Sequence, residues 1–388
     1  MKENEQDRIS GYLSIGNQNM LFGELSDDFL MAMGAREILH GIPVPIGQGE
    51  NGQIAVRSIF IDMAKVIGGD ASFVYADKYL TYIKAAGGDN AEPMLVSEGA
   101  KAADEGRYED ACKLLRAALM VDPKSQAAQY LYGRACKACY EIAGDDEAFA
   151  DDYESIGKIE ADDGSEFPQN AKRVGMEGLQ SLAGDRQAVG NYIGNFKAES
   201  MDTFEVLTMM HPDFAMGYYF LGYAYLNMGL YLKAKLTWDE FIKLSSAADI
   251  NEAGLDYDQL EDLRNEVTRM LLDLDDPVKI EKGCNQIMSG DFVGGRNTLI
   301  DFTTGRYENW WPLWYYLGVA ESALGNINEA ISDLKKVLTL SPSNTDVMDE
   351  LAQLYEAIGD VANAAKYRNK INTVNANREL ERQENMEG

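Results

Sequence analysis

The sequence predicts an all-α fold built from repeated helical hairpins. Residues 311–344 read as two short helices, with Leu317 and Gly318 in the first and Ala330 and Leu334 in the second. The same spacing of small and large apolar residues recurs along the chain, and most of the 36 glycines fall at turns between candidate helices. Hydrophobic residues make up 46% of the sequence and prolines number only 9, which indicates a folded chain.

Four segments carry this spacing well and set the phase of the series. They are 92–125, 215–248, 311–344 and 345–378. In 92–125, Gly99 and Ala111 supply the small side chains that let two helices approach closely, while Leu115 fills the layer against the next hairpin. Each of the four segments is therefore expected to form one hairpin.

Other segments match the spacing only in part. They are 57–90, 126–158 and 276–309. A lengthened turn is expected within 126–158, because Gly144 comes late in that segment. Residues 171–212 predict two or three helices, and a repeat that began at 181 would place Phe204 and Leu207 at packing positions.

The first 55 residues lie outside the series. Residues 26–40 predict a helix that begins at Ser26, and Pro43 and Pro45 make the next segment a loop. The predicted organisation has five parts: a non-repeat N-terminal segment, an N-terminal repeat block, an acidic linker, a C-terminal repeat block and a polar tail. Their ranges are 1–55, 56–159, 160–170, 171–378 and 379–388.

The charge of the chain restricts its partners. The net charge is −29, from 64 acidic and 35 basic residues, so nucleic acids and anionic membranes would be repelled. Basic or uncharged partners are favoured. The first ten residues show no apolar signal-peptide region, and the apolar run 218–232 is too short and interrupted for a membrane span. With four sparse cysteines, these features predict a cytoplasmic protein.

The segment 311–344 resembles the tetratricopeptide repeat (TPR) family. Trp314, Leu317–Gly318, Ala330, Leu334 and Pro342 follow its pattern of Trp, Leu-Gly, Ala, a large apolar residue and Pro. With the other matching segments, the resemblance covers somewhat more than half of the chain. It implies a right-handed α-solenoid whose first helices line a concave face that binds peptides or proteins. It does not name the ligand.

Aromatic and apolar residues on the expected concave face are candidates for partner binding. Tyrosine and tryptophan are frequent anchors, because they bury a large area at low entropic cost and keep a polar tip. The alternative is ordinary packing between repeats. The candidates are Tyr219, Tyr223, Leu226, Tyr315, Val319, Trp310 and Trp311.

A basic pair forms a second candidate. Arg134 and Lys137 follow Tyr130 at helical spacing, so the two bases could hold an acidic side chain or a peptide carboxylate. An ion pair with neighbouring acids is the preferred alternative. The clamp by which chaperone-binding members of the family hold a carboxylate is not expected, since Val96 and Ala100 occupy its Lys and Asn slots.

Two motifs suggest a metal or a cofactor, but each has a simpler explanation. Cys136 and Cys139 form a CxxC that Cys112 would have to complete, and buried small residues at packing positions explain all three. The glycines of 47–52 match a dinucleotide fingerprint, but the prolines before them disfavour the strand that it needs. We therefore expect neither metal nor cofactor.

The sequence thus predicts a non-catalytic protein–protein interaction module that binds a peptide or a partner helix on the concave surface. One alternative is a regulatory or chaperone-associated adaptor in which 1–55 is the working part. The third is a metal- or nucleotide-dependent enzyme centred on the glycines or the cysteines. No nucleophile–base set can be built around His40 or His211, which disfavours catalysis.

Overall fold

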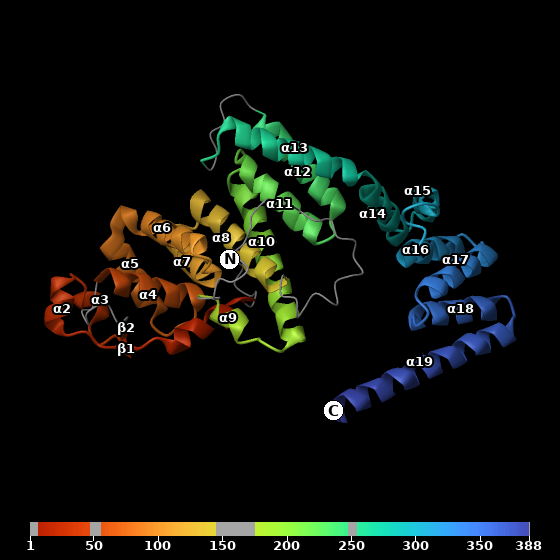
Figure 1. Ribbon diagram of the computed structural model, residues 1–388, viewed down its shortest axis with the longest axis horizontal. Coiled ribbons are helices and arrows are strands. Elements are labelled where there is room, and N and C mark those ends of the chain that lie inside the picture. Colours follow the sequence, from red (N-terminus) through yellow and green to blue (C-terminus); the bar gives the residue numbers. More distant parts are fainter. Residues whose placement is uncertain (1–6, 47–55, 145–174, 247–253, 388) are drawn as a thin grey trace. The chain divides into compact units, whose positions relative to one another are not determined.

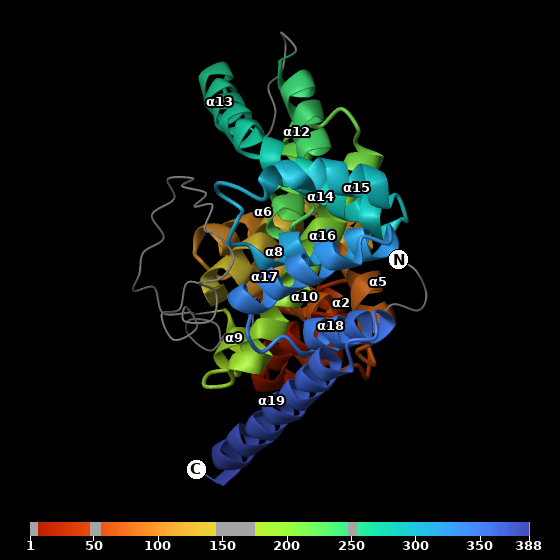
Figure 2. The same cartoon turned by 90° about the vertical axis from the view of Figure 1, so that its right-hand side faces the viewer.

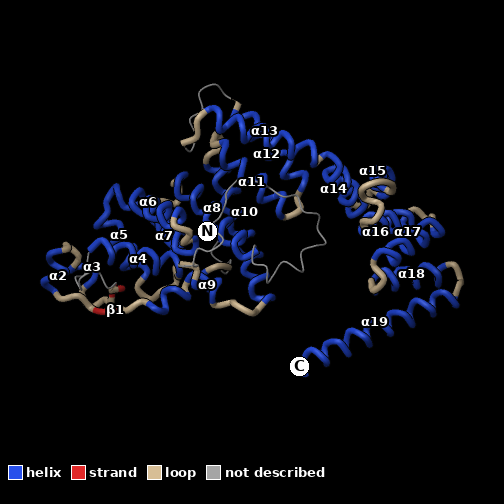
Figure 3. Tube along the Cα trace, viewed as in Figure 1, coloured by secondary structure: helices blue, strands red, loops and turns tan. Residues whose placement is uncertain are grey.

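The computed structural model describes residues 7–46, 56–144, 175–246 and 254–387 (Figure 1). Helices account for most of this part of the chain (Figure 3). The predicted all-α arrangement of hairpins is confirmed. A two-residue antiparallel pair, β1 with β2, is the sheet that the described ranges contain. Among the helices described, none is long and apolar enough to cross a membrane.

The chain forms two compact units. Unit 1 comprises Met1–Gly229 and Thr237–Glu261, and unit 2 comprises Leu230–Leu236 and Asp262–Gly388. The acidic linker predicted at 160–170 lies outside the described residues, so the predicted division into repeat blocks stays a prediction.

Unit 1 contains the elements up to α11, and it shares α12 and α13 with unit 2. The bounds are α1 Ser10–Leu13, η1 Ile15–Asn19, β1 Phe22–Gly23, α2 Asp27–Ala32, α3 Arg36–Leu39, β2 Val44–Pro45, α4 Val56–Gly69, α5 Ala76–Gly87, η2 Gly88–Asn90, α6 Ala91–Asp104, α7 Tyr108–Val121, α8 Gln126–Gly144, α9 Glu177–Gln180, α10 Arg186–Met210, α11 Ala215–Asn227, α12 Tyr231–Ser245 and α13 Tyr257–Asp273.

Unit 2 continues with three consecutive hairpins. The bounds are α14 Asp275–Met288, α15 Phe292–Leu299, η4 Ile300–Phe302, α16 Trp311–Ala323, α17 Ile327–Leu340, α18 Thr345–Ala357 and α19 Val361–Glu387. The helices pair as α14 with α15, α16 with α17 and α18 with α19, and successive pairs meet through α15 with α16 and α17 with α18. Figure 2 shows α16, α17 and α18 side by side.

In several hairpins a glycine in the first helix determines how closely the two helices pack. A Cβ atom added at Gly318 would lie 2.9 Å from the side chain of Leu334, and one added at Gly99 would lie 2.7 Å from that of Leu115. Any side chain here would push the second helix away. The close approach of the two helices therefore requires the small residues that were expected at these positions.

One hairpin is formed by helices that are far apart in the sequence. A Cβ atom added at Gly133 on α8 would lie 2.6 Å from the ring of Phe204 on α10. The hydroxyl of Ser200, also on α10, donates a 2.9 Å hydrogen bond to the carbonyl of Gly133, which is 67 residues away in the sequence. The repeat predicted to begin at 181 is thus wrong as a separate hairpin. Phe204 and Leu207 are buried as expected, but Phe204 packs against α8, and the side chain of Leu207 lies beside Gly217 of α11. Apolar periodicity identifies the buried face of a helix and not the helix that covers it.

The N-terminal region differs from the expected helix and loop. Ser26 begins α2 as predicted, since its hydroxyl accepts a hydrogen bond from the Phe29 amide. The helix predicted over 26–40 is divided into α2 and α3 near Gly34, which adopts a left-handed φ of 67°. The segment predicted as a loop contains β2, where Pro45 pairs with Phe22 of β1, because a two-residue edge tolerates a proline.

The same region belongs to the core of unit 1. Ile9, Leu13, Leu30, Leu39 and Val44 are buried in one cluster with side chains of α4 and α5. Residues 7–46 therefore pack as part of the fold and do not form a separate arm.

A buried carboxylate holds α9 in place. Glu109 on α7 is inaccessible to solvent and accepts hydrogen bonds from the amides of Gly178 (2.8 Å) and Leu179 (2.9 Å) and from the hydroxyl of Tyr192 (2.9 Å). Burial raises the pKa of Glu109 to about 7, although these three donated hydrogen bonds lower it. This carboxyl group joins three elements that are distant in the sequence.

Candidate functional site

The first helices of the three hairpins in unit 2 present a surface that combines aromatic and acidic side chains. We call it the first-helix face. It is made of Met288 on α14, Trp311, Tyr315, Tyr316 and Val319 on α16, and Asp346, Asp349 and Glu350 on α18.

Tyr315 connects α16 to the next first helix. Its hydroxyl donates a 2.9 Å hydrogen bond to Oε1 of Glu350 on α18. Burial and this hydrogen bond raise the pKa of Tyr315 to about 12, so the hydroxyl stays a donor at neutral pH. Burial also raises the pKa of Glu350, and the carboxylates of Asp346 and Asp349 raise it further. The pair thus fixes an acidic patch beside an aromatic ring.

Tyr316 connects α16 to the preceding first helix. Its hydroxyl lies 3.7 Å from the sulfur of Met288, which is 72% exposed at the end of α14. Because Tyr315 and Tyr316 are adjacent, one helix contributes rings to both of its neighbours. These side-chain contacts connect the first helices of three successive hairpins.

Two tryptophans stand at the start of α16. Trp310 is 40% exposed and Trp311 is 38% exposed, and the Trp311 ring lies 6.5 Å from that of Tyr315. Val319, two turns after Trp311, is half-buried. Trp311 and Tyr315 are thus neighbours in the structure, and a binding role for Trp310, Trp311, Tyr315 and Val319 stays a prediction.

The candidates on α11 of unit 1 have a different environment. Tyr219 and Tyr223 were expected on an open face, but each is only 6% exposed. The Tyr223 ring lies 4.8 Å from that of Trp238, and the Tyr219 ring lies 5.3 Å from that of Phe241. Leu226 is half-buried. The expected exposure is thus corrected: α11 carries no charged residue, and its apolar surface is covered by packing.

The basic pair on α8 does not act as a unit. Lys137 forms an ion pair with Glu141 on the same helix, which is the alternative that the sequence favoured. The guanidinium of Arg134 instead lies over aromatic rings, 5.4 Å from Tyr130 and 5.5 Å from Phe220. That Tyr130, Arg134 and Lys137 together hold a carboxylate stays a prediction.

The cysteines pack in the core. Cys112, Cys136 and Cys139 are fully buried, and the sulfurs of Cys112 and Cys136 lie 3.8 Å apart across α7 and α8. Burial raises the pKa of both the Cys112 and the Cys136 thiol, which disfavours the thiolate that a metal requires. Over the described ranges, no three His, Cys, Asp or Glu side chains are placed to bind a metal ion. The glycines of 47–52 lie outside the described residues.

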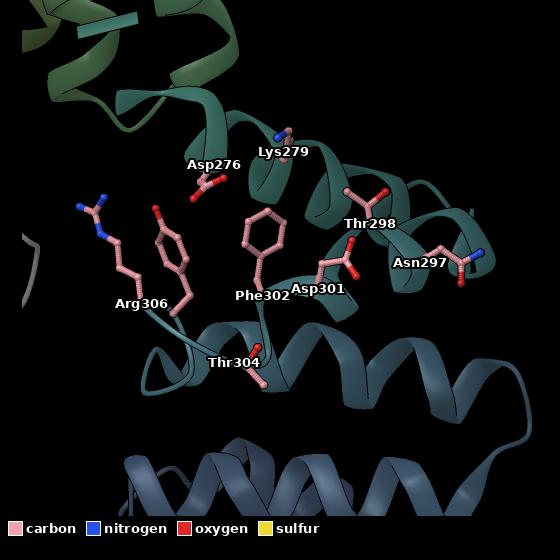
Figure 4. Close-up of a pocket in the computed structure, with 9 residues that line it drawn as sticks. Asp276, Lys279, Asn297, Thr298, Asp301, Phe302, Thr304 and Arg306 are labelled. Carbon is pink, nitrogen blue, oxygen red and sulfur yellow. The ribbon is translucent and has the colours of Figure 1, made fainter. Parts of the chain in front are cut away.

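Unit 2 also contains a hollow of about 520 Å³ that the sequence did not indicate (Figure 4). Helix α14, the end of α15, η4 and the loop that follows form its wall. The Tyr307 hydroxyl is buried there and makes no hydrogen bond to the described residues. Lys279 is paired with Asp275 at 2.6 Å, and Arg306 stacks over Tyr307 at 5.6 Å. The lining residues are Asp276, Lys279, Asn297, Thr298, Asp301, Phe302, Thr304, Arg306 and Tyr307.

The two histidines lie at the surface of unit 1. Nδ1 of His40 is 2.7 Å from Asp27, and Nε2 of His211 is 3.0 Å from the carbonyl of Lys124. Neither histidine has a nucleophilic side chain among these partners. The expectation of a non-catalytic protein stays a prediction.

Comparison with known proteins agrees with the repeat spacing. Residues 312–344 match the tetratricopeptide repeat model. No curated protein sequence matches the chain.

Three solved structures show how limited the overall likeness is. A crystal structure of MamA is 16% identical, with 50% of this chain and 96% of that chain covered, at a TM-score of 0.29. MamA from Desulfovibrio magneticus RS-1 is 15% identical, with 47% and 87% covered, at a TM-score of 0.26. The Cut9–Hcn1 hetero-tetramer of APC/C is 15% identical, with 83% and 61% covered, at a TM-score of 0.28. Such scores carry no conclusion about shared function, so the family assignment depends on the matched segment and its hairpin. Residues 312–344 therefore form a tetratricopeptide repeat.

Proposed function

We propose that unit 2 binds a peptide segment of a partner protein on the first-helix face. The observation that carries this proposal is the pair of neighbouring tyrosines on α16. Tyr316 reaches Met288 on one side and Tyr315 reaches Glu350 on the other, so that one surface extends over three hairpins. A partner segment that crosses all three helices would contact every part of it.

The dimensions of the surface suit an extended peptide. Packed helices lie about 8–10 Å apart, and an extended chain advances about 3.3 Å per residue. Each step between helices thus corresponds to about three peptide residues. Trp311 stands at the start of α16, the middle of the three first helices, where its exposed ring area would be buried on binding and would supply much of the free energy.

The other candidate functions have less support. An adaptor in which 1–55 is the working part would have to act through the folded surface of unit 1, because residues 7–46 are packed into its core. The Cys112–Cys136 cluster consists of buried thiols with raised pKa values, which disfavours a metal enzyme centred on the cysteines. A partner helix remains the alternative ligand for the first-helix face.

Selection from a random peptide library tests the proposal. The intact chain would be used as bait, and the dissociation constants of selected peptides would be measured by fluorescence anisotropy. We expect Trp311→Ala to weaken these peptides at least tenfold, because the anchor ring is lost. The matched control is Tyr257→Ala, which removes an aromatic ring that is 65% exposed on α13.

Two results would count against the proposal. One is that selected peptides bind the Trp311→Ala chain as tightly as the unchanged chain. The other is that both variants weaken binding equally. Trp311 is partly exposed, so its replacement should leave the fold intact, and a thermal melt of each variant would verify this.

A further inference from the structure

We infer that the segment bound by the first-helix face is basic, with lysine or arginine residues that flank its apolar anchor. The inference rests on the proposed function and adds the chemical class of the partner. It follows from the acidic side chains beside the aromatic rings and from two of them, Asp346 and Glu350, for which the described residues provide no ion pair.

Acidic residues dominate the two helices that make up most of the first-helix face. Neither α16 nor α18 contains a lysine, arginine or histidine. Their acids are Glu321, Asp346, Asp349, Glu350 and Glu356. A positively charged partner would therefore meet no like charge on either helix.

Two of these acids are neutralised within unit 2. Glu321 is 3% exposed, pairs with Arg296 and accepts a 2.6 Å hydrogen bond from Asn326. Glu356 accepts two hydrogen bonds of 3.0 Å from Arg368 on α19. Both carboxylates thus have a structural role and do not require a partner.

The three acids of the first-helix face are not neutralised to the same degree. Asp349 lies 3.7 Å from Arg368, which already binds Glu356 closely. Glu350 accepts a hydrogen bond from the neutral hydroxyl of Tyr315 and forms no ion pair with a described residue. Asp346 is exposed, and the described side chains give it neither an ion pair nor a hydrogen bond. Negative charge therefore accumulates at the start of α18.

A cation would satisfy both the carboxylates and the rings. Lysine and arginine form charge-assisted hydrogen bonds with carboxylates, and they are attracted to the faces of aromatic rings within about 6 Å. The fold already uses the second contact, since Lys336 lies 5.7 Å from the ring of Trp314 and Lys335 lies 5.5 Å from that of Tyr355. The net charge of −29 would also speed the approach of a basic segment. A peptide carboxylate or an acidic segment would be repelled.

Three peptides of about nine residues test the inference. This length covers the two steps between three helices and leaves one or two residues at each end. They share the same leucine and tyrosine positions, and the remaining positions carry lysine, glutamine or glutamate. We expect the lysine peptide to bind the intact chain at least tenfold more tightly than the glutamine peptide, and the glutamate peptide more weakly than both. The advantage of the lysine peptide should shrink as salt is raised from low to physiological concentration.

A pair of double variants locates the effect. Asp346→Asn with Glu350→Gln should remove most of the advantage of the lysine peptide and leave the glutamine peptide unchanged. The control, Asp258→Asn with Asp262→Asn, makes the same change in net charge on α13 and should have little effect.

The outcomes separate this inference from the proposed function. Equal binding of the lysine and glutamine peptides, or equal loss in both double variants, would overturn the inference of a basic partner. Failure of all three peptides to bind would do the same. In each case, the proposed docking function would still hold if Trp311→Ala weakened the binding of library-selected peptides. If Trp311→Ala left their binding unchanged, both the docking function and the basic partner would be overturned.

Discussion

Tyr315 donates a 2.9 Å hydrogen bond to Glu350, and this contact joins the first helices of two consecutive hairpins. The two residues belong to the same face but to different repeats. Because the tyrosine ring is held by its partner carboxylate, the acidic and aromatic parts of the first-helix face keep a fixed relation. A rigid surface loses less entropy when a ligand binds.

Replacement of Tyr315 by phenylalanine should destabilise unit 2 modestly. The ring and its packing remain, but half-buried Glu350 loses its donor, which costs about 1 kcal/mol. We expect a lower midpoint in urea unfolding and faster amide hydrogen exchange in α18. Tyr316→Phe is the matched control, because its hydroxyl reaches only the sulfur of Met288, a weak acceptor. A loss in the control as large as that in Tyr315→Phe would show that the Glu350 contact is not the cause.

The stability of unit 1 should depend on pH through Glu109. Burial raises its pKa from 4.5 in the unfolded chain to about 7 in the folded protein, so the folded state holds the proton more tightly. Its contribution is fully present below about pH 4.5 and is lost as the pH rises toward 7. The loss amounts to at most about 3 kcal/mol.

Comparison with Glu109→Gln isolates this contribution. The variant cannot ionise, so the free energy of unfolding should fall less steeply between pH 4.5 and 7 than in the unchanged chain. Urea unfolding at a series of pH values measures both slopes. Parallel curves for the two proteins would mean that Glu109 does not titrate in this range.

The α8–α10 hairpin should tolerate no side chain at Gly133. Its Cβ would lie 2.6 Å from the Phe204 ring, so Gly133→Ala is expected to destabilise unit 1 by about 1–3 kcal/mol. Gly190→Ala is the control, since a Cβ at that position of α10 would meet no atom within 4 Å. The control should be neutral or slightly stabilising, because alanine favours helix over glycine.

A second change makes the test specific. Phe204→Leu removes part of the ring that crowds the new methyl group, so the double variant should lose less stability than the two single losses added together. Simple additivity in urea unfolding would contradict direct contact between Gly133 and Phe204.

The candidate site could be predicted only in part. Tyr315 and Tyr219 occupy the same position of two repeats, and the sequence treats them alike. In the structure Tyr219 is 6% exposed beneath Phe241, whereas Tyr315 is half-buried on a surface that continues into Glu350. Helical periodicity gives the direction of a side chain, but exposure depends on the elements that cover it.

The sequence by itself determined those hairpins whose two helices follow one another directly in the chain. Gly318 meets Leu334 one helix later, so the spacing along the chain already encodes the packing. Only the tertiary structure decided that Phe204 packs against Gly133, that Glu109 holds α9, and which tyrosines stay accessible. These contacts join segments that are distant in the chain. The periodicity of apolar residues identifies the buried face of a helix, but it does not identify the element that packs against that face.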